Sequence, residues 1–115
     1  AFLDAVEGGT LSYENMVAPP PEEMTTPGAI ADFGEQVRRR LTAWWDGLAD
    51  RSGAQPVETY YGVQPLHEVL ERTAWHSAQH ARQVMSLLEQ MGIGPDRPLT
   101  QDDLKGLPVP EKLWD

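Results

Sequence analysis

The sequence predicts an all-α protein organised as a helical bundle, and two amphipathic segments carry this prediction. Residues 65–91 form one uninterrupted segment that Gly92 closes. A helix over it is about 40 Å long at 1.5 Å per residue, which is the full height of a bundle for a chain of 115 residues. Residues 27–49 supply a second long amphipathic helix. The length suits a single domain, residues 1–115.

The chain begins abruptly, with what looks like the end of a helix. Phe2, Leu3 and Val6 share one helical face, and Gly8-Gly9 offer a C-terminal stop. An isolated helix of about two turns is marginal. We therefore expect the bundle to be incomplete at the N-terminus, with its first helix or helices missing from this chain. An independent short turn is the alternative.

Residues 10–27 are predicted to form a long connection, because Pro19-Pro20-Pro21 and Pro27 exclude regular helix. Tyr13 and Met16 are expected to hold this connection down by packing.

The first complete helix is predicted from about residue 27 to 49, with Thr26 as its cap and Pro27 at the first helical position. Apolar residues recur along it every three or four positions and form one stripe of Ile30, Phe33, Val37, Leu41, Trp44 and Leu48. Residues 53–64 form a second connection, in which 57–61 suit an extended backbone.

Beyond residue 91, Pro95 and Pro98 interrupt the chain. Residues 100–103, Thr-Gln-Asp-Asp, resemble a capping box and predict a short helix that Gly106 ends. Leu113 and Trp114 are expected to pack back on the bundle.

Composition excludes several classes of function. The chain has no cysteine, so disulfides, thiolate zinc clusters and a cysteine nucleophile are absent. The formal charge of −9 argues against nucleic acid as a partner, and Arg38-Arg39-Arg40 is interpreted as a solvated helix face. Apolar runs are far shorter than the roughly 20 residues of a membrane span, and a signal-peptide pattern is lacking. We expect a soluble, cytoplasmic protein of bacterial type, with no membrane partner.

All three histidines lie on the predicted helix 65–91, where helix geometry separates them. At 100° per residue, His76 and His80 fall within about 40° of each other. They share a stripe with Val69, Thr73, Val84, Leu87 and Met91. His67 lies about 140° from His80. The stripe is expected to face the bundle interior, so His76 and His80 should point inward and His67 toward water.

Two inward imidazoles one helical turn apart can chelate one metal ion. A complete site needs at least one further ligand. The carboxylates Asp32, Glu35 and Asp46 lie off the apolar stripe of their helix and are poor candidates. Spacing alone leaves open a structural, hydrogen-bonded pair. Ser77 follows the first histidine in place of glutamate, which excludes the His-Glu-x-x-His type of zinc protease.

The stretch from Leu66 to Gln83, with its core Trp-His-Ser-Ala-Gln-His-Ala-Arg-Gln, resembles the metal-binding helix of the DinB-like superfamily. The Leu-Leu-Glu-Gln-Met-Gly-Ile continuation and the Gly-Leu-Pro-Val-Pro-Glu-Lys tail extend the resemblance over residues 64–115.

This resemblance implies an up-up-down-down four-helix bundle with a divalent ion, Zn, Ni or Fe, bound between helices. His76 and His80 match two of the three histidine ligands that are typical of the family. The third comes from an earlier helix, and this chain has no histidine before His67. His67 cannot replace it, because it lies on the wrong face of the helix that carries the pair.

Characterised members of the superfamily include metal-dependent thiol transferases and isomerases that use mycothiol, bacillithiol or glutathione, and others have been called hydrolases. By resemblance, we expect a metal-dependent thiol S-transferase or isomerase acting on a small-molecule substrate. His76 and His80 would be ligands, with Gln79, Gln83 and Tyr60 or Tyr61 as supporting or substrate contacts. The alternative is a non-catalytic helical interaction module that forms a homodimer and in which the histidine pair is structural.

Overall fold

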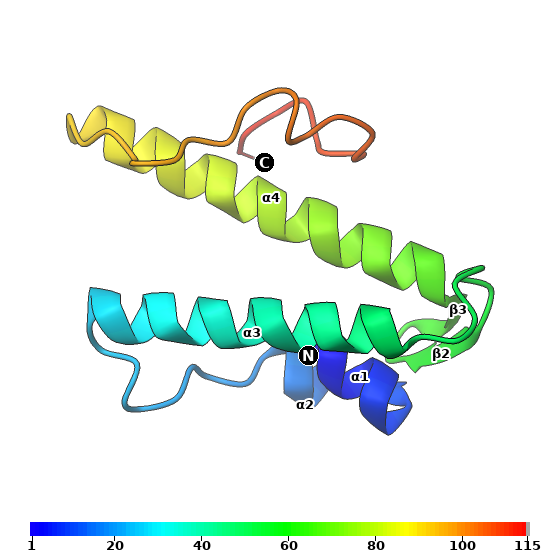
Figure 1. The fold of residues 1–115 in the computed structure, drawn as a ribbon. Helices are drawn as coiled ribbons and strands as arrows, with labels where there is room; N and C mark the ends of the chain where they lie inside the picture. Colours follow the sequence, from blue (N-terminus) through cyan, green and yellow to red (C-terminus); the bar gives the residue numbers. More distant parts are fainter. Residues whose placement is uncertain (115) are drawn as a thin grey trace. The chain divides into compact units, whose positions relative to one another are not determined.

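The computed structural model describes residues 1–114 and divides into two compact units, one of residues 1–67 and one from residue 68 onward. The elements in order are α1 (Phe2–Gly8), β1 (Thr10–Leu11), α2 (Tyr13–Met16), α3 (Pro27–Gly47), β2 (Pro56–Thr59), β3 (Gly62–Pro65) and α4 (Leu66–Gln90) (Figure 1).

The prediction of an all-α, up-up-down-down four-helix bundle is wrong. Only α3 and α4 are long helices in the described chain, with 21 and 25 residues, whereas α1 and α2 have seven and four. The structure also contains a three-stranded mixed sheet in the order β1-β2-β3, which an all-α protein would lack. The bundle prediction extrapolated from two amphipathic helices, and amphipathicity does not state what the apolar face packs against.

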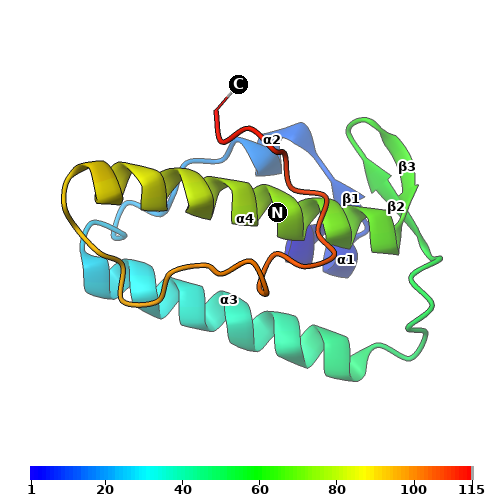
Figure 2. The same cartoon turned by 90° about the horizontal axis from the view of Figure 1, so that it is seen from above.

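The hairpin of the sheet forms around residues 57–61, where the sequence indicated extended backbone. Strand β1 lies in residues 10–27, where the sequence indicated only a loop. β2 pairs antiparallel with β3, with Thr59 opposite Gly62, so Tyr60 and Tyr61 form a two-residue hairpin turn (Figure 2). Positive φ at Gly62 (115°) suits glycine there. β1 adds in parallel, with Leu11 opposite Thr59. The β-branched and aromatic residues of 57–61 favour this hairpin.

The long connection predicted for residues 10–27 is correspondingly interrupted by β1 and α2. Ser12 caps α2, because its hydroxyl accepts from the backbone N–H of Asn15 at 3.2 Å. Tyr13 contacts the hairpin, with its ring 5.7 Å from that of Tyr60, yet it is 59% exposed. Tyr13 therefore packs against the hairpin through one ring contact, while most of its side chain is exposed.

The core of the first unit joins α1, the sheet and the start of α4. Its buried apolar residues are Phe2, Leu3, Ala5, Leu11, Val57 and Leu66. The predicted stop of α1 is confirmed: Gly9 adopts the left-handed conformation at φ 91°. α3 joins this core only near its C-terminal end, where Trp44 meets the Phe2 ring edge-on at 5.4 Å.

Helix α3 begins as predicted. The Thr26 hydroxyl accepts from the Ala29 N–H at 3.1 Å, and Pro27 occupies the first position. Arg38 and Arg39 pair with Glu35 within the exposed helix face, and Arg40 pairs with Asp4 and Glu7 of α1. The prediction that the arginine cluster is a solvated helix face is thus confirmed.

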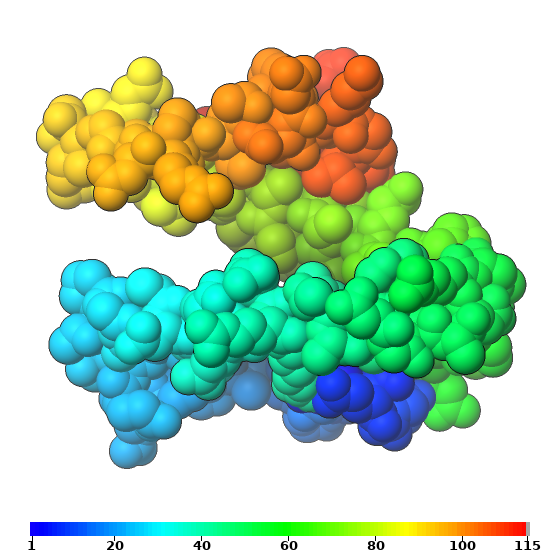
Figure 3. Space-filling view, viewed as in Figure 1, coloured from blue at the N-terminus to red at the C-terminus, as the bar shows by residue number. Residues whose placement is uncertain are grey.

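The second unit consists of α4 from residue 68 onward and the segment that follows it (Figure 3). α4 ends as predicted, at a turn in which Gly92 has φ 73° and the Ile93 N–H donates to the Leu88 carbonyl at 2.9 Å. The predicted helix over residues 100–106 is wrong, because residues 101–106 form turns. Thr100 and Asp103 do make both bonds of a capping box. No helix follows because Gly106 and two prolines leave too few residues for further turns.

Candidate metal-ligating pair on helix α4

His76 and His80 lie together on α4, one turn apart, as the sequence predicted. Their Nε2 atoms are 3.1 Å apart, and their ring centroids are 4.6 Å apart at an interplanar angle of 62°. The two ring nitrogens therefore converge on one region of space. One Nε2 donates a hydrogen bond to the other.

The expectation that this face points into a protein interior is wrong for most of its length. Val69 is 1% exposed, but Val84, Leu87 and Met91 are 55%, 48% and 70% exposed, and both histidines belong to the exposed class. Helix periodicity identified the stripe correctly but could not identify its cover. Beyond Val69, the buried residue of α4 in the second unit is Gln79, which lies on another face.

Gln83 fixes the orientation of His80. The Nε2 group of Gln83 donates to the backbone carbonyl of Leu113 at 3.0 Å, which settles which end of the amide is the oxygen. Its Oε1 then lies 2.9 Å from Nδ1 of His80. Because a carboxamide oxygen only accepts, Nδ1 of His80 carries the proton, and its Nε2 presents a lone pair.

The electrostatic surroundings favour a neutral imidazole at His76. Desolvation is the largest cause that lowers its pKa, and the electrostatic interactions with His80 and Arg72 lower it further. Neutral imidazole is the form that binds a metal ion. The rings of Trp75 and His76 make a T-shaped contact at a centroid distance of 5.8 Å.

The geometry of the pair fits a divalent ion. With metal–nitrogen bonds of about 2.05 Å, two ligand nitrogens are about 2.9 Å apart at a right angle and about 3.3 Å apart at a tetrahedral angle. The observed 3.1 Å between the Nε2 atoms falls between these values. Within residues 1–114, however, no group of three or more His, Cys, Asp or Glu side chains is placed to hold an ion. The pair therefore offers two of the ligands that a metal site would need.

The other residues singled out from the sequence have different roles. The Nδ1 of His67 lies 3.0 Å from the Gly53 carbonyl, at the start of α4. This histidine is exposed, as predicted, and belongs to the first unit. Glu35 is engaged by Arg38 and Arg39. Tyr60 and Tyr61 form the hairpin turn of the first unit and contact each other at 4.9 Å between ring centroids.

Gln79 binds the C-terminal segment rather than a histidine. It is buried, and its Nε2 donates to the carbonyls of Lys112 and Leu113 at 3.2 and 2.8 Å. Its Oε1 accepts from Arg82, whose Nη1 also donates to the Pro110 carbonyl at 2.8 Å. Side chains of α4 thus satisfy backbone carbonyls of a proline-interrupted segment that forms neither helix nor strand.

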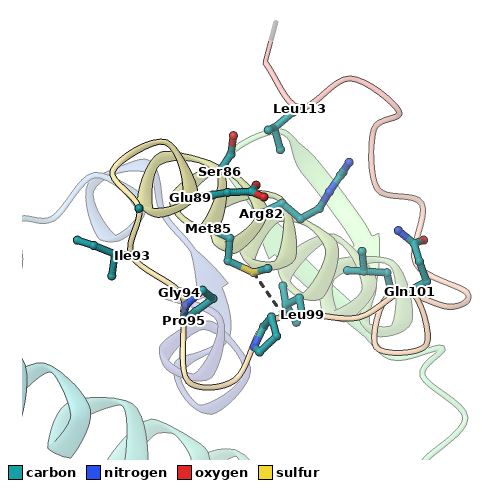
Figure 4. A pocket seen from close by; sticks show the side chains of 13 residues that line it. Arg82, Met85, Ser86, Glu89, Ile93, Gly94, Pro95, Leu99, Gln101 and Leu113 are labelled. Carbon is teal, nitrogen blue, oxygen red and sulfur yellow. Dashed lines mark hydrogen bonds between the residues drawn. The ribbon is translucent and has the colours of Figure 1, made fainter.

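A pocket that the sequence did not indicate lies between α4 and the segment after it (Figure 4). It measures about 650 Å³, and Arg82, Met85, Glu89, Leu99 and Leu113 are among the residues that line it. The backbone N–H of Leu99 donates to the Met85 sulfur at 3.3 Å and holds the segment against the helix. Neither histidine of the pair lines this pocket, so the two features are separate.

Comparison of the chain with protein-family models, with curated proteins and with solved structures gave no match. The resemblance to the DinB-like superfamily therefore rests on residues 64–115 alone and stays an expectation. None of the helices within residues 1–114 combines the length and the apolar character that crossing a bilayer requires.

Proposed function

We propose that this chain is a metal-binding protein in which His76 and His80 provide the protein ligands of a divalent-ion half-site. The observation that carries the proposal is the convergence of the two Nε2 atoms at 3.1 Å, with Nδ1 of His80 held by Gln83. A ligating histidine typically donates its other ring N–H to an oxygen acceptor, which orients the ring and raises its basicity. The Gln83 amide supplies such an acceptor.

Following the resemblance to the DinB-like superfamily, the proposal extends to a metal-dependent thiol S-transferase or isomerase. A bound Zn, Ni or Fe ion would lower the pKa of a coordinated low-molecular-weight thiol and so supply a thiolate at neutral pH. The chain contains no cysteine, so a sulfur nucleophile would have to come from a cosubstrate. The role of the protein residues is to orient His80 through Gln83 and to keep His76 neutral.

The first test is metal content, measured by mass spectrometry on protein purified without a chelator or a polyhistidine tag. Wild-type protein is expected to hold a divalent ion, and His80→Ala is expected to lose it. His67→Ala is the matched control and should keep it, because His67 lies in the other compact unit, at the Gly53 carbonyl. Equal loss in the two variants, or no ion in the wild type, would contradict the proposal.

Exposed apolar surface favours the second candidate, a non-catalytic interaction module. On α3, Ile30, Phe33, Val37 and Leu41 are between 38% and 55% exposed, although they form one stripe. On α4, Val84, Leu87 and Met91 are between 48% and 70% exposed. Contiguous apolar surface on a soluble protein commonly marks an interaction site. Metal-free protein that self-associates, with no thiol-transfer activity after metal loading, would support this candidate over the enzyme.

A further inference from the structure

Three side chains of α4 hold the end of the chain through its backbone. Gln79 and Gln83 both donate to the carbonyl of Leu113, at 2.8 and 3.0 Å. A carbonyl oxygen has two lone pairs and can accept both bonds. Arg82 donates to the Pro110 carbonyl at 2.8 Å and to Oε1 of Gln79 at 2.7 Å. These bonds therefore join into one network that spans α4 and the segment of residues 110–113.

This C-terminal segment, residues 110–113, is recognised by its carbonyls. The side chains of residues 110–112 are exposed, so they contribute little to holding the segment on the helix. Gln79 is buried and also donates to the Lys112 carbonyl at 3.2 Å. A buried carboxamide needs partners for both of its ends, and the network supplies them. Gln79 and Arg82 thus anchor the segment at a defined place on α4.

The Leu113 carbonyl decides which end of the Gln83 amide faces His80. Because this carbonyl can only accept, it takes the Nε2 end of Gln83 and leaves Oε1 beside Nδ1 of His80, at 2.9 Å. With the amide turned over, an N–H would face Nδ1, and the ring proton would have to move to Nε2 of His80. The Nε2 lone pair of His80 therefore depends on the position of Leu113.

The same reasoning assigns the proton of His76. Its Nε2 lies 3.1 Å from Nε2 of His80, and the latter presents a lone pair, so Nε2 of His76 is the donor. His76 must give up this proton, or transfer it to Nδ1, before its Nε2 can bind an ion. His80 needs no such change. The tautomer of His80 is therefore the feature of the pair that is already suited to metal binding.

We propose that the C-terminal segment, anchored by Gln79 and Arg82, is a positioning element that keeps His80 in the Nδ1–H form required of a metal ligand. Gln79 and Arg82 are positioning residues, because their bonds go to the carbonyls of the segment and to each other. The link to metal binding rests on the proposed function. The tautomer itself belongs to the metal-free protein and is measurable there.

The experiment is a two-bond ¹⁵N–¹H correlation NMR spectrum of the histidine rings, recorded on the whole chain with EDTA at about pH 8, where imidazole is neutral. Wild-type protein should show His80 with its proton on Nδ1 and His76 with its proton on Nε2. Gln79→Met removes the bonds to the segment, and Arg82→Met removes the guanidinium but keeps an aliphatic stem. In both variants His80 should become a mixture of tautomers.

Two further variants calibrate this measurement. Gln83→Met removes the acceptor itself and should give the largest change at His80. Gln90→Met makes the matched substitution on the same helix, where Gln90 contacts Ser86, and should keep the wild-type tautomers. Circular dichroism checks that each variant is folded. If Gln79→Met fails to fold, Arg82→Met still decides the outcome.

Zn²⁺ affinity, measured by competition with a chromophoric chelator, connects the tautomer to function. Gln79→Met and Arg82→Met should bind Zn²⁺ about tenfold more weakly than wild type, at the low end of the effect of losing a direct partner of a ligand. Gln90→Met should bind like the wild type. Shifted tautomers with unchanged Zn²⁺ affinity would overturn the contribution of the segment to metal binding.

The remaining outcomes separate this inference from the proposed function. A proton on Nε2 of His80 in the wild type, or an unchanged Nδ1–H form in both anchor variants, would overturn the positioning role of the segment even if the pair binds Zn²⁺. The expected tautomers in a wild-type protein that binds no Zn²⁺ would overturn the proposed function and keep the control of His80 by the segment.

Discussion

The side-chain oxygen of Gln83 lies 2.9 Å from Nδ1 of His80, and this bond links the candidate metal pair to the end of the chain. The same amide donates to the carbonyl of Leu113, 30 residues away in the sequence. Leu113 in turn accepts from Gln79. The C-terminal segment therefore sets the position of Gln83, and Gln83 sets the tautomer of His80.

Replacement of Gln83 by alanine should weaken metal binding about 10- to 100-fold, because His80 loses the acceptor that orients it. The dissociation constant can be measured by competition with a chromophoric chelator. Gln90→Ala is the matched control on the same helix, since Gln90 contacts Ser86 and not a histidine. Equal affinities of Gln83→Ala and wild type would show that this hydrogen bond does not support the pair.

The two valines of the predicted stripe, Val69 and Val84, should respond differently to alanine substitution. Val69 is 1% exposed, and its truncation removes buried methyl groups, so we expect a loss of about 1–3 kcal/mol in unfolding free energy. Val84 is 55% exposed and should change stability by less than about 0.5 kcal/mol. Urea denaturation of metal-free protein at low concentration measures both. Similar losses at the two positions would mean that the whole stripe is buried in solution.

Gly53→Ala should destabilise the protein by about 1–3 kcal/mol. Gly53 has φ 73°, and an added Cβ would lie only 2.8 Å from the Cβ of His67. Its carbonyl also accepts from the backbone N–H of His67 at 2.9 Å, at the start of α4.

The control for Gly53 is Gly47→Ala, at the last residue of α3, where an added Cβ meets no atom within 4 Å. This substitution should be neutral or stabilising by up to about 1 kcal/mol, because it reduces the entropy of the unfolded chain. Thermal unfolding compares the two variants. An unchanged midpoint for Gly53→Ala would show that Gly53 and His67 are not packed this closely in solution.

Acid should remove the stabilising effect of Glu35. Hydrogen bonds from Arg38 first and Arg39 second lower the pKa of Glu35 from 4.5 to about 2. A carboxylate with a lowered pKa in the folded state stabilises that state above its usual pKa, and this contribution is lost as the pH falls from about 4.5 to about 2. The difference in melting temperature between wild type and Glu35→Gln should therefore shrink over this range.

Glu22→Gln removes the same charge from an exposed residue in the proline-rich connection and serves as the control for Glu35. Because the Glu35 pairs are exposed, the effect on melting temperature should be small and should decrease with added salt. A difference for Glu35→Gln that stays constant from pH 5 to pH 2 would contradict the assigned pairing.

Sequence periodicity identified the two long helices, and capping and glycine signals identified residues at which helices begin and end. Thr26 and Pro27 start α3, Gly9 ends α1 and the glycine after α4 closes it, because caps and stops depend on local backbone preferences. The placement of His76 and His80 on one face also follows from the helix alone, since 100° per residue fixes it.

Tertiary structure decided what those faces meet, and here the sequence-based expectations failed. The stripe with Val84 and Leu87 resembles a core stripe in the sequence yet is exposed, while polar Gln79 on another face is buried under the C-terminal segment. Hydrophobic periodicity states that a face is apolar, but burial requires a partner that is distant in the sequence.

The chain by itself thus determined that two imidazoles converge on one side of a helix. Only the fold decided that Gln83 would hold one of them through the carbonyl of Leu113, and that the extended residues 56–65 would form a hairpin that pairs with β1. Local hydrogen bonding and side-chain entropy act over a few neighbours and can be deduced from order in the sequence. Contacts between residues tens of positions apart depend on the fold of the whole chain, and the local sequence does not determine them.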